Sequence, residues 1–135
     1  MRGTKPNLKK AADALGKAPP VPKWFPAEAV EEWRRVVPGM VERRILTKGD
    51  LGSLENYCLC RAQIRQCQDT LANGDHYVQS ANSALRPHPA FRVMHSAMTI
   101  ARQLAAELGL TPVSRSRPAI ADEAKDDDWS GLVDE

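Results

Sequence analysis

The side chains in this sequence best suited to metal binding are Cys58, Cys60 and Cys67, with His88 and His95 further along the chain. Cys58 and Cys60 lack the spacing of a structural zinc site, and on a helix their thiols would point about 160° apart. Cys60 and Cys67 share a helix face but have no second pair of ligands nearby. An odd number of cysteines also fits a reducing compartment. We therefore expect packing cysteines, no metal site and no cofactor.

Catalytic motifs are the next candidates for chemistry. The sequence contains no Gly-x-Ser-x-Gly, His-Glu-x-x-His or phosphate-loop motif. The acidic cluster Asp122–Asp128 has carboxylates of the kind that hold Mg²⁺ in a nuclease. A run of like charges, however, is typical of a solvated tail. The sequence therefore predicts that the protein is not an enzyme.

Charge is distributed unevenly along the chain and indicates binding. Residues 1–23 carry six basic residues and one acidic residue, whereas residues 119–135 carry one basic and seven acidic residues. A basic arm neutralises phosphates and releases counterions, so it binds DNA without reading its sequence. A plain solvated terminus explains the same composition equally well, and both interpretations stay open. The predicted DNA-binding residues are Arg2, Lys5, Lys9, Lys10, Lys17 and Lys23, with Arg115 and Arg117 after the last predicted helix.

The acidic end of the chain contains three apolar residues at helical spacing. Trp129, Leu132 and Val133 lie at positions i, i+3 and i+4 after the acidic run. This spacing is typical of a short segment that folds into the groove of a partner. A disordered end with incidental apolar residues is the alternative interpretation.

Size and composition favour one small helical domain. Aromatic residues make up 5% of the chain and charged residues 27%, so the core must be aliphatic and modest. No stretch approaches the roughly 18 apolar residues of a membrane span, and no apolar signal-peptide core follows the basic start. We expect a flexible basic arm over residues 1–23, a helical core over residues 24–117 and a disordered acidic tail over residues 118–135.

Helix signals divide the expected core into three helices. The first should begin at Pro26 and should break or kink at Pro38-Gly39. The second should run from about residue 48 to 72, with Thr47 as its N-cap and Asp50 completing a weak capping box. The third, after the break at Pro87-His88-Pro89, should run from about residue 89 to 108 and end at Gly109. Thr111 should cap one further turn that starts at Pro112.

The segment between the second and third helices is expected to be short. Asn73-Gly74-Asp75 is a turn signal, and residues 76–79 are expected to be a short extended piece. Long strands are absent from the pattern. The predicted fold is therefore all-α, with one helix followed by a long antiparallel helical hairpin.

The second helix is apolar on two sides. One stripe contains Leu51, Leu54, Cys58 and Ala62, and the other contains Tyr57, Cys60, Ile64, Cys67 and Leu71. A helix of this kind lies between two surfaces, and a neighbouring subunit can supply one of them in a domain this small. The residues predicted to form a subunit interface are Leu54, Tyr57, Cys60, Ile64, Cys67 and Leu71.

Five short motifs occur in order along the chain. They are Arg2-Gly3-x-Lys5-Pro6; Glu31-Glu32-Trp33-Arg34-Arg35; Leu46-Thr47-x-x-Asp50-Leu51 through Tyr57-Cys58; Pro87-His88-Pro89-Ala90; and Ala105-x-x-Leu108-Gly109-Leu110-Thr111-Pro112-x-Ser114-Arg115. Each motif is weak alone. Their order and spacing together resemble the small terminase subunits of tailed double-stranded-DNA bacteriophages.

The resemblance implies a homo-oligomeric ring that recognises the packaging start on viral DNA in the cytoplasm of the infected host. It also implies delivery of that DNA to a large terminase subunit, whose ATPase and nuclease perform the chemistry. The basic arm then corresponds to a DNA contact, and Trp129, Leu132 and Val133 correspond to a motor contact. The alternatives are a small dimeric DNA-binding transcriptional regulator and a structural adaptor within the virion. The regulator would need a recognition helix with exposed polar residues that read bases, and no predicted helix offers a convincing one.

Overall fold

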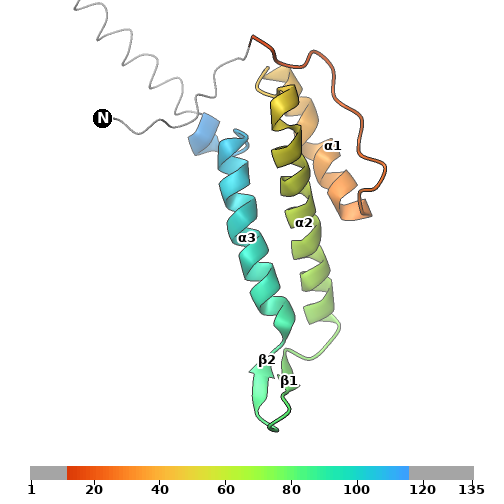
Figure 1. The fold of residues 1–135 in the computed structure, drawn as a ribbon, viewed down its shortest axis with the longest axis vertical. Coiled ribbons are helices and arrows are strands. Elements are labelled where there is room, and N and C mark those ends of the chain that lie inside the picture. The colour runs from red at the N-terminus through yellow and green to blue at the C-terminus, as the bar shows by residue number, and fades with distance from the viewer. Residues whose placement is uncertain (1–11, 116–135) are drawn as a thin grey trace, which may run out of the picture.

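The computed structural model describes residues 12–115, which form three helices and one short β-hairpin (Figure 1). The helices are α1 (Ala27–Glu42), α2 (Leu51–Ala72) and α3 (Pro89–Glu107), and a 3₁₀ turn, η1 (Lys48–Asp50), leads into α2. α2 and α3 form a long antiparallel hairpin, and α1 packs on the side of α2 away from α3. The predicted order of one helix followed by a helical hairpin is confirmed.

A β-hairpin joins the far ends of α2 and α3 and extends beyond them (Figure 1). Its strands are β1 (Tyr77–Gln79) and β2 (Leu85–Pro87), and all six of their residues are exposed. The antiparallel register pairs Tyr77 with Pro87, Val78 with Arg86 and Gln79 with Leu85. β1 confirms the expected extended piece, but the second strand was not predicted, so the expectation of an all-α fold was too narrow. A three-residue strand is specified by its partner across the turn and leaves little local pattern.

α1 begins immediately after Pro26, as expected, but it does not end at Pro38. The helix continues through Pro38 to Glu42, so, of the predicted break or kink, the break is wrong. Pro38 is exposed, whereas Val37 and Met40 on either side of it are buried in the core. Packing of these apolar side chains outweighs the one backbone hydrogen bond that the proline ring removes.

The signals predicted for the start of α2 and for the end of α3 are both present in the structure. Before α2, the Asp50 carboxylate accepts hydrogen bonds from the Thr47 backbone N–H (3.0 Å) and hydroxyl (2.9 Å). After α3, Gly109 has φ of 75°, and the Leu110 N–H donates to the Ala105 carbonyl at 2.8 Å. These are the left-handed residue and the long-range bond of a Schellman ending.

The predicted turn after α3 is also present. Thr111 and Ser114 form a reciprocal cap: the Thr111 N–H donates to Ser114 Oγ (3.2 Å) and the Ser114 N–H donates to Thr111 Oγ1 (3.1 Å). Residues 112–115 are helical. The pair satisfies two backbone donors that would otherwise lack partners at a helix start.

The two apolar stripes of α2 are both covered by the same chain. α1 covers one side of α2 and α3 covers the other. Cys67 and Leu71, from the second stripe, form a buried cluster with Ala90 of α3. Leu54 and Cys58, from the first stripe, are fully buried. A second subunit is therefore not needed to explain why α2 is apolar on two sides.

A strap of extended chain, residues 12–26, runs along the outside of α1 (Figure 1). The Leu15 N–H donates to the Leu46 carbonyl at 2.8 Å, and Trp33 Nε1 donates to the Pro19 carbonyl at 3.4 Å. Leu15 and Val21 pack against the core. The flexible arm was expected to reach residue 23, but the structure packs its part from residue 12 onward onto the helices. Within residues 12–115, no helix is long and apolar enough to cross a membrane.

Candidate nucleic-acid interface

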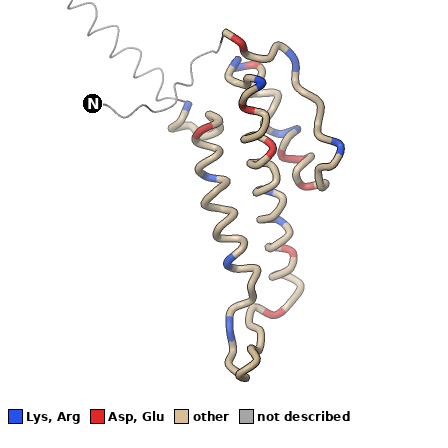
Figure 2. Tube along the Cα trace, in the orientation of Figure 1, with Lys and Arg blue, Asp and Glu red and all other residues tan. Residues whose placement is uncertain are grey.

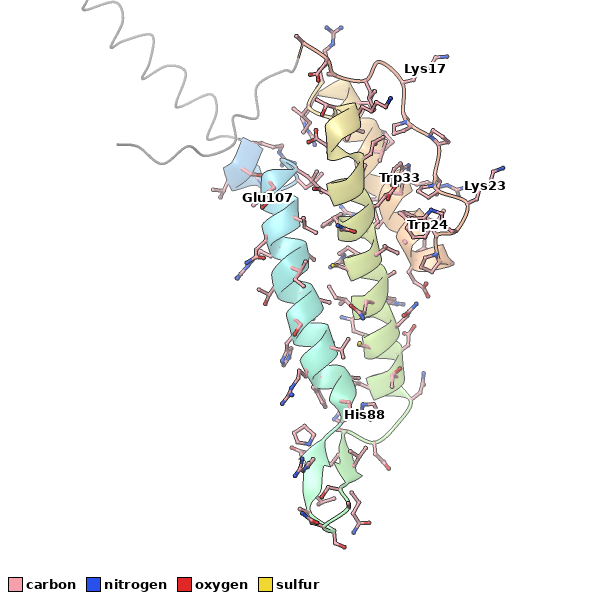
Figure 3. All side chains as sticks on the ribbon, viewed as in Figure 1. Lys17, Lys23, Trp24, Trp33, His88 and Glu107 are labelled. Atoms are coloured by element: carbon pink, nitrogen blue, oxygen red, sulfur yellow. The ribbon has the colours of Figure 1, made fainter. Side chains whose placement is uncertain are left out.

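The predicted basic residues that the structure describes do not form one patch. Lys17 and Lys23 lie on the strap, where both side chains are exposed and point away from the helices (Figure 3). Arg115 is exposed beyond the end of α3, where it lines a small hollow with Arg43, Ile45 and Gly109. The remaining predicted DNA-binding and motor-contact residues lie outside the described residues; they are Arg2, Lys5, Lys9, Lys10, Arg117, Trp129, Leu132 and Val133.

An exposed tryptophan accompanies the lysines of the strap. Trp24 follows Lys23 directly and keeps 62% of its surface exposed. Its ring contacts Phe25 edge-on, with centroids 4.9 Å apart, and Phe25 in turn contacts Trp33 at 5.7 Å. The aromatic contacts fix the strap where α1 begins and leave a basic, aromatic surface facing solvent.

A second basic region, which sequence reasoning missed, lies at the tip of the α2–α3 hairpin. From residue 76 to residue 106 the sequence contains no Asp or Glu, while Arg86, Arg92 and Arg102 all fall within it. Figure 2 shows this as blue positions without red along the β-hairpin and along α3 until its last residue, Glu107. The long acid-free interval is the sequence signal that would have identified the region.

The tip contains a groove of about 920 Å³ between the β-hairpin and the first turns of α3. Arg86 of β2 and Arg92 of α3 both line it, and both are exposed. Neither arginine forms an ion pair with any residue in the 12–115 range. Tyr77 also lines the groove, with 61% of its surface exposed. The groove therefore offers cations and a ring to a ligand.

His76 and His88 connect the β-hairpin to the ends of α2 and α3 on either side of this groove. His76 Nε2 donates to the Leu71 carbonyl at 3.0 Å, and the His88 N–H donates to the His76 carbonyl at 2.7 Å. His88 Nδ1 accepts the Ala90 N–H at 3.0 Å and so caps α3. The ring of Phe91 meets the ring of His76 edge-on at 5.6 Å. Because these groups fix one another, the β-hairpin is tied to both helix ends.

A buried charged network joins α1 to α2. Glu32 is 7% exposed and accepts hydrogen bonds from Tyr57 (2.6 Å) and from Arg35 Nε (2.7 Å) and Nη2 (2.5 Å). Arg61 Nε lies 4.0 Å from the same carboxylate. Sequence reasoning named Glu32 only as part of the motif Glu31-Glu32-Trp33-Arg34-Arg35. The signal that it missed is a charged residue within the buried stripe of α1.

The network changes the pKa values of its members. Burial alone would raise the pKa of Glu32, but hydrogen bonds from Arg35 and Tyr57 and the charges of Arg35 and Arg61 outweigh it and lower that pKa. Burial and the contact with Glu32 raise the pKa of Tyr57 to about 12. Burial, with the charge of Glu32, also raises the pKa of Cys58 to about 12. The Cys58 thiol is therefore a packing group, because a nucleophile or metal ligand must be a thiolate.

The residues predicted to form a subunit interface lie mostly inside the protomer. Those that are buried are Leu54, Tyr57, Ile64, Cys67 and Leu71, and Cys60 is partly exposed. A groove of about 480 Å³ lies beside Cys60 and Ile100, and another of about 300 Å³ is lined by Tyr57, Ile64 and Met98. These two grooves flank the packing of α2 against α3. In the described part of the chain, no cluster of three or more His, Cys, Asp or Glu could hold a metal ion.

The arrangement is that of a small helical subunit, built on an antiparallel hairpin, with basic surfaces at the strap and at the tip. The family model of the phage terminase small subunit matches residues 29–125. The chain therefore belongs to the phage terminase small subunit family. No curated protein and no solved structure gives a significant match.

Proposed function

We propose that this protein binds viral double-stranded DNA at the packaging start, delivers it to the large terminase subunit and regulates that subunit's ATPase and nuclease. The observation that carries the proposal is the family match over residues 29–125, which supports a role in phage genome packaging. On this proposal the small subunit acts by binding, and the large subunit performs the chemistry. Its place of action is the cytoplasm of the infected bacterial host.

The DNA contact that we propose begins with the basic arm. Arg2, Lys5, Lys9 and Lys10 would follow the phosphate backbone without reading bases. Lys17 and Lys23 continue this basic surface along the strap, and their exposure supports the assignment. Arg115 and Arg117 would contribute a second contact beyond α3.

The subunit contacts of a ring are proposed for the two flanks of the α2–α3 hairpin. A closed head-to-tail ring requires two different surfaces on each protomer. Met98 (40% exposed) and Ile100 (47% exposed) lie about 160° apart around α3, so they face opposite flanks. One flank presents Ile100 with Cys60, and the other presents Met98 above Tyr57 and Ile64. Leu54, Cys67 and Leu71 are buried within the protomer and line neither groove.

The acidic tail is proposed as the contact with the large terminase subunit. Its apolar residues Trp129, Leu132 and Val133 would fold into a groove of that subunit, and the acidic run would favour a basic rim around it. This part of the proposal rests on the spacing of the sequence alone.

Native mass spectrometry of the purified chain at low micromolar concentration is the first test. One discrete species well above a tetramer would support the ring, whereas a monomer or a dimer with a palindromic DNA footprint would replace the proposal with a transcriptional regulator.

The second test is stimulation of the large subunit's ATPase by the full chain. Replacing Trp129, Leu132 and Val133 by alanine should abolish stimulation and leave the oligomer intact. The matched control is Ser130→Ala, which lies among these residues in the sequence, has no assigned role and should keep full stimulation. Stimulation equal to the full chain in the triple alanine variant would refute the tail's role.

A further inference from the structure

The tip of the hairpin has a charge pattern that the proposed roles of arm and tail do not use. Arg86 and Arg92 are exposed, line one groove and have no ion-pair partner within the described residues. Acidic residues are absent from position 76 to position 106. An unpaired cation pair in an acid-free region is an electrostatic site for an anion.

The length of the acid-free region indicates an extended anion. Arg86, Arg92 and Arg102 are spread from the β-hairpin along α3, which is about 28 Å long at 1.5 Å per residue. Duplex DNA presents about one charge per 1.7 Å of its axis, so one duplex can offer a phosphate to each of Arg86 and Arg92, which line the same groove. A short acidic peptide would satisfy only part of this surface.

The shape of the β-hairpin also fits DNA. Two three-residue strands are each about 10 Å long, and the major groove is about 12 Å wide and admits a two-stranded β-ribbon. The strands present apolar and aromatic side chains to solvent, with Leu85 at 73% and Tyr77 at 61% exposure. Such side chains give apolar contacts in a groove, while arginines at the rim bind phosphates.

The local structure keeps the site formed in the free protein. His76 is bonded to the end of α2, and His88 caps α3 and is bonded to His76. Because both ends of the β-hairpin are tied in this way, the hairpin does not have to be ordered on binding. A preformed site avoids that entropic cost.

We propose that the tip formed by the β-hairpin and the first turns of α3 is a DNA-binding site in which Arg86 and Arg92 bind backbone phosphates. This inference rests on the proposed packaging function, and it adds a DNA contact in the folded core to that of the N-terminal arm. The two contacts lie on different elements and can be removed separately.

The test compares the full chain with the variant Arg86→Gln/Arg92→Gln. Binding to a fluorescein-labelled duplex of about 30 base pairs is measured by anisotropy over a range of salt concentrations. Loss of two phosphate contacts should reduce the slope of log K against log salt by about 1.8, which weakens binding about 60-fold at 0.1 M salt. Arg86→Lys/Arg92→Lys should retain most of the affinity, because a point charge is sufficient for a phosphate.

The matched control is Arg34→Gln/Arg44→Gln, which removes the same charge from exposed positions on and after α1. An equal loss of affinity in this control would overturn the inference, because net charge alone would then explain it. A second measurement needs no variant: bound DNA should protect Arg86 and Arg92 of the unmodified chain from phenylglyoxal. Lack of protection would also overturn the inference.

The remaining outcomes separate this inference from the proposed function. If the full chain binds DNA and the tip variant binds equally well, the tip is not a DNA site, although the packaging role stands. If the tip variant instead loses affinity for a poly-glutamate peptide alone, the tip binds an acidic protein and the inference is wrong. If the full chain itself does not bind DNA, the proposed function fails as well.

Discussion

The hydroxyl of Tyr57 in α2 donates a 2.6 Å hydrogen bond to the carboxylate of Glu32 in α1, and the two residues are 25 positions apart in the chain. Arg35, one turn after Glu32, donates two further hydrogen bonds to the same carboxylate. Glu32 and Tyr57 are both buried, at 7% and 5% exposure. This contact therefore fixes α1 against the hairpin through a polar group that water cannot replace without opening the core.

Removing the Tyr57 hydroxyl should destabilise the fold measurably. Tyr57→Phe deletes a hydrogen bond to a charged acceptor, which typically contributes about 1.5–3 kcal/mol. We expect a loss of that size in the free energy of unfolding, measured by urea denaturation followed by helical circular dichroism. The control Glu31→Gln changes the exposed neighbour of Glu32 and should stay within about 0.5 kcal/mol of the unmodified chain. A smaller loss in Tyr57→Phe than in this control would contradict the role given to the contact.

Protonation of Glu32 should contribute to the loss of stability in acid. Its pKa in the folded state is lowered, so its stabilising contribution is present above the unfolded pKa and is lost as pH falls through the folded pKa. The unmodified chain should therefore lose stability steeply in acid, and Glu32→Gln should lose less. Urea midpoints of the two proteins should approach each other as pH falls from about 6 to about 2. Parallel curves would show that Glu32 titrates as it does in the unfolded chain.

Ionisation of Tyr57 should contribute to the loss of stability at alkaline pH. Its pKa is raised to about 12, from an ordinary value of about 10. The folded state keeps the phenol protonated, so this contribution is complete below about pH 10 and is lost as pH rises toward 12. Tyr57→Phe should lack that part of the alkaline loss. In a Tyr77→Phe background, Tyr57 is the one tyrosine left in the sequence, so absorbance of the tyrosinate ion should then follow unfolding. Tyrosinate absorbance near pH 10 in that variant while it is still folded would count against the raised pKa of Tyr57.

This network also shows which part of the structure could be predicted from sequence. Glu32 follows Ala29 and precedes Trp33 and Val36, all of which are buried, so its position on the helix wheel indicated burial. Its partner did not follow from any local pattern, because Tyr57 lies on another helix and its position depends on how α1 and α2 pack. Tyr57 was consequently assigned to a subunit interface and not to a partner in α1.

The helix ends were predictable because their signals are local. Thr47 with Asp50, Gly109, and Thr111 before Pro112 each act within a few residues, and the structure places each as expected. The second strand and the groove at the tip were not predicted. They arise where β2 pairs with β1 and where His76 meets His88, and both contacts depend on the folded hairpin.

Replacing Gly109 or Gly52 by alanine should change the stability of the fold in opposite directions. Gly109 has φ of 75°, where an L side chain is strained, so Gly109→Ala should destabilise by about 1 kcal/mol or more. Gly52 lies in the first turn of α2, and beyond its chain neighbours and the backbone of its own helix no atom lies within 4 Å of the position of an added Cβ. Gly52→Ala should stabilise by about 0.4–1 kcal/mol, because alanine has less chain entropy to lose. Thermal unfolding of the two variants side by side checks the signs. A stabilised Gly109→Ala would refute this account of Gly109, and a destabilised Gly52→Ala would refute that of Gly52.

Truncations at the N-terminus should separate DNA binding from folding. A chain that begins at residue 12 keeps the Leu15–Leu46 backbone bond and the packing of Val21, so its unfolding should match that of the full chain. It lacks Arg2, Lys5, Lys9 and Lys10, so its DNA binding should be weaker and less dependent on salt. A chain that begins at residue 24 also loses Leu15 and Val21 from the core and should be less stable by at least about 1 kcal/mol. Equal stability of the two truncations would mean that the strap does not hold the fold.

The flanks of α3 should control assembly if the proposed ring contacts are correct. Met98→Glu and Ile100→Glu each place a charge on an exposed apolar position beside a groove, where a neighbouring subunit would bury it at a cost of several kcal/mol. Each variant should reduce the oligomer to smaller species in native mass spectrometry, while circular dichroism of the protomer stays unchanged. Thr99→Glu is the matched control, because Thr99 lies between them in sequence but faces solvent away from both grooves. Intact oligomers in both Met98→Glu and Ile100→Glu would remove these flanks from the interface, and dissociation in Thr99→Glu alone would move the contact to the outer face of α3.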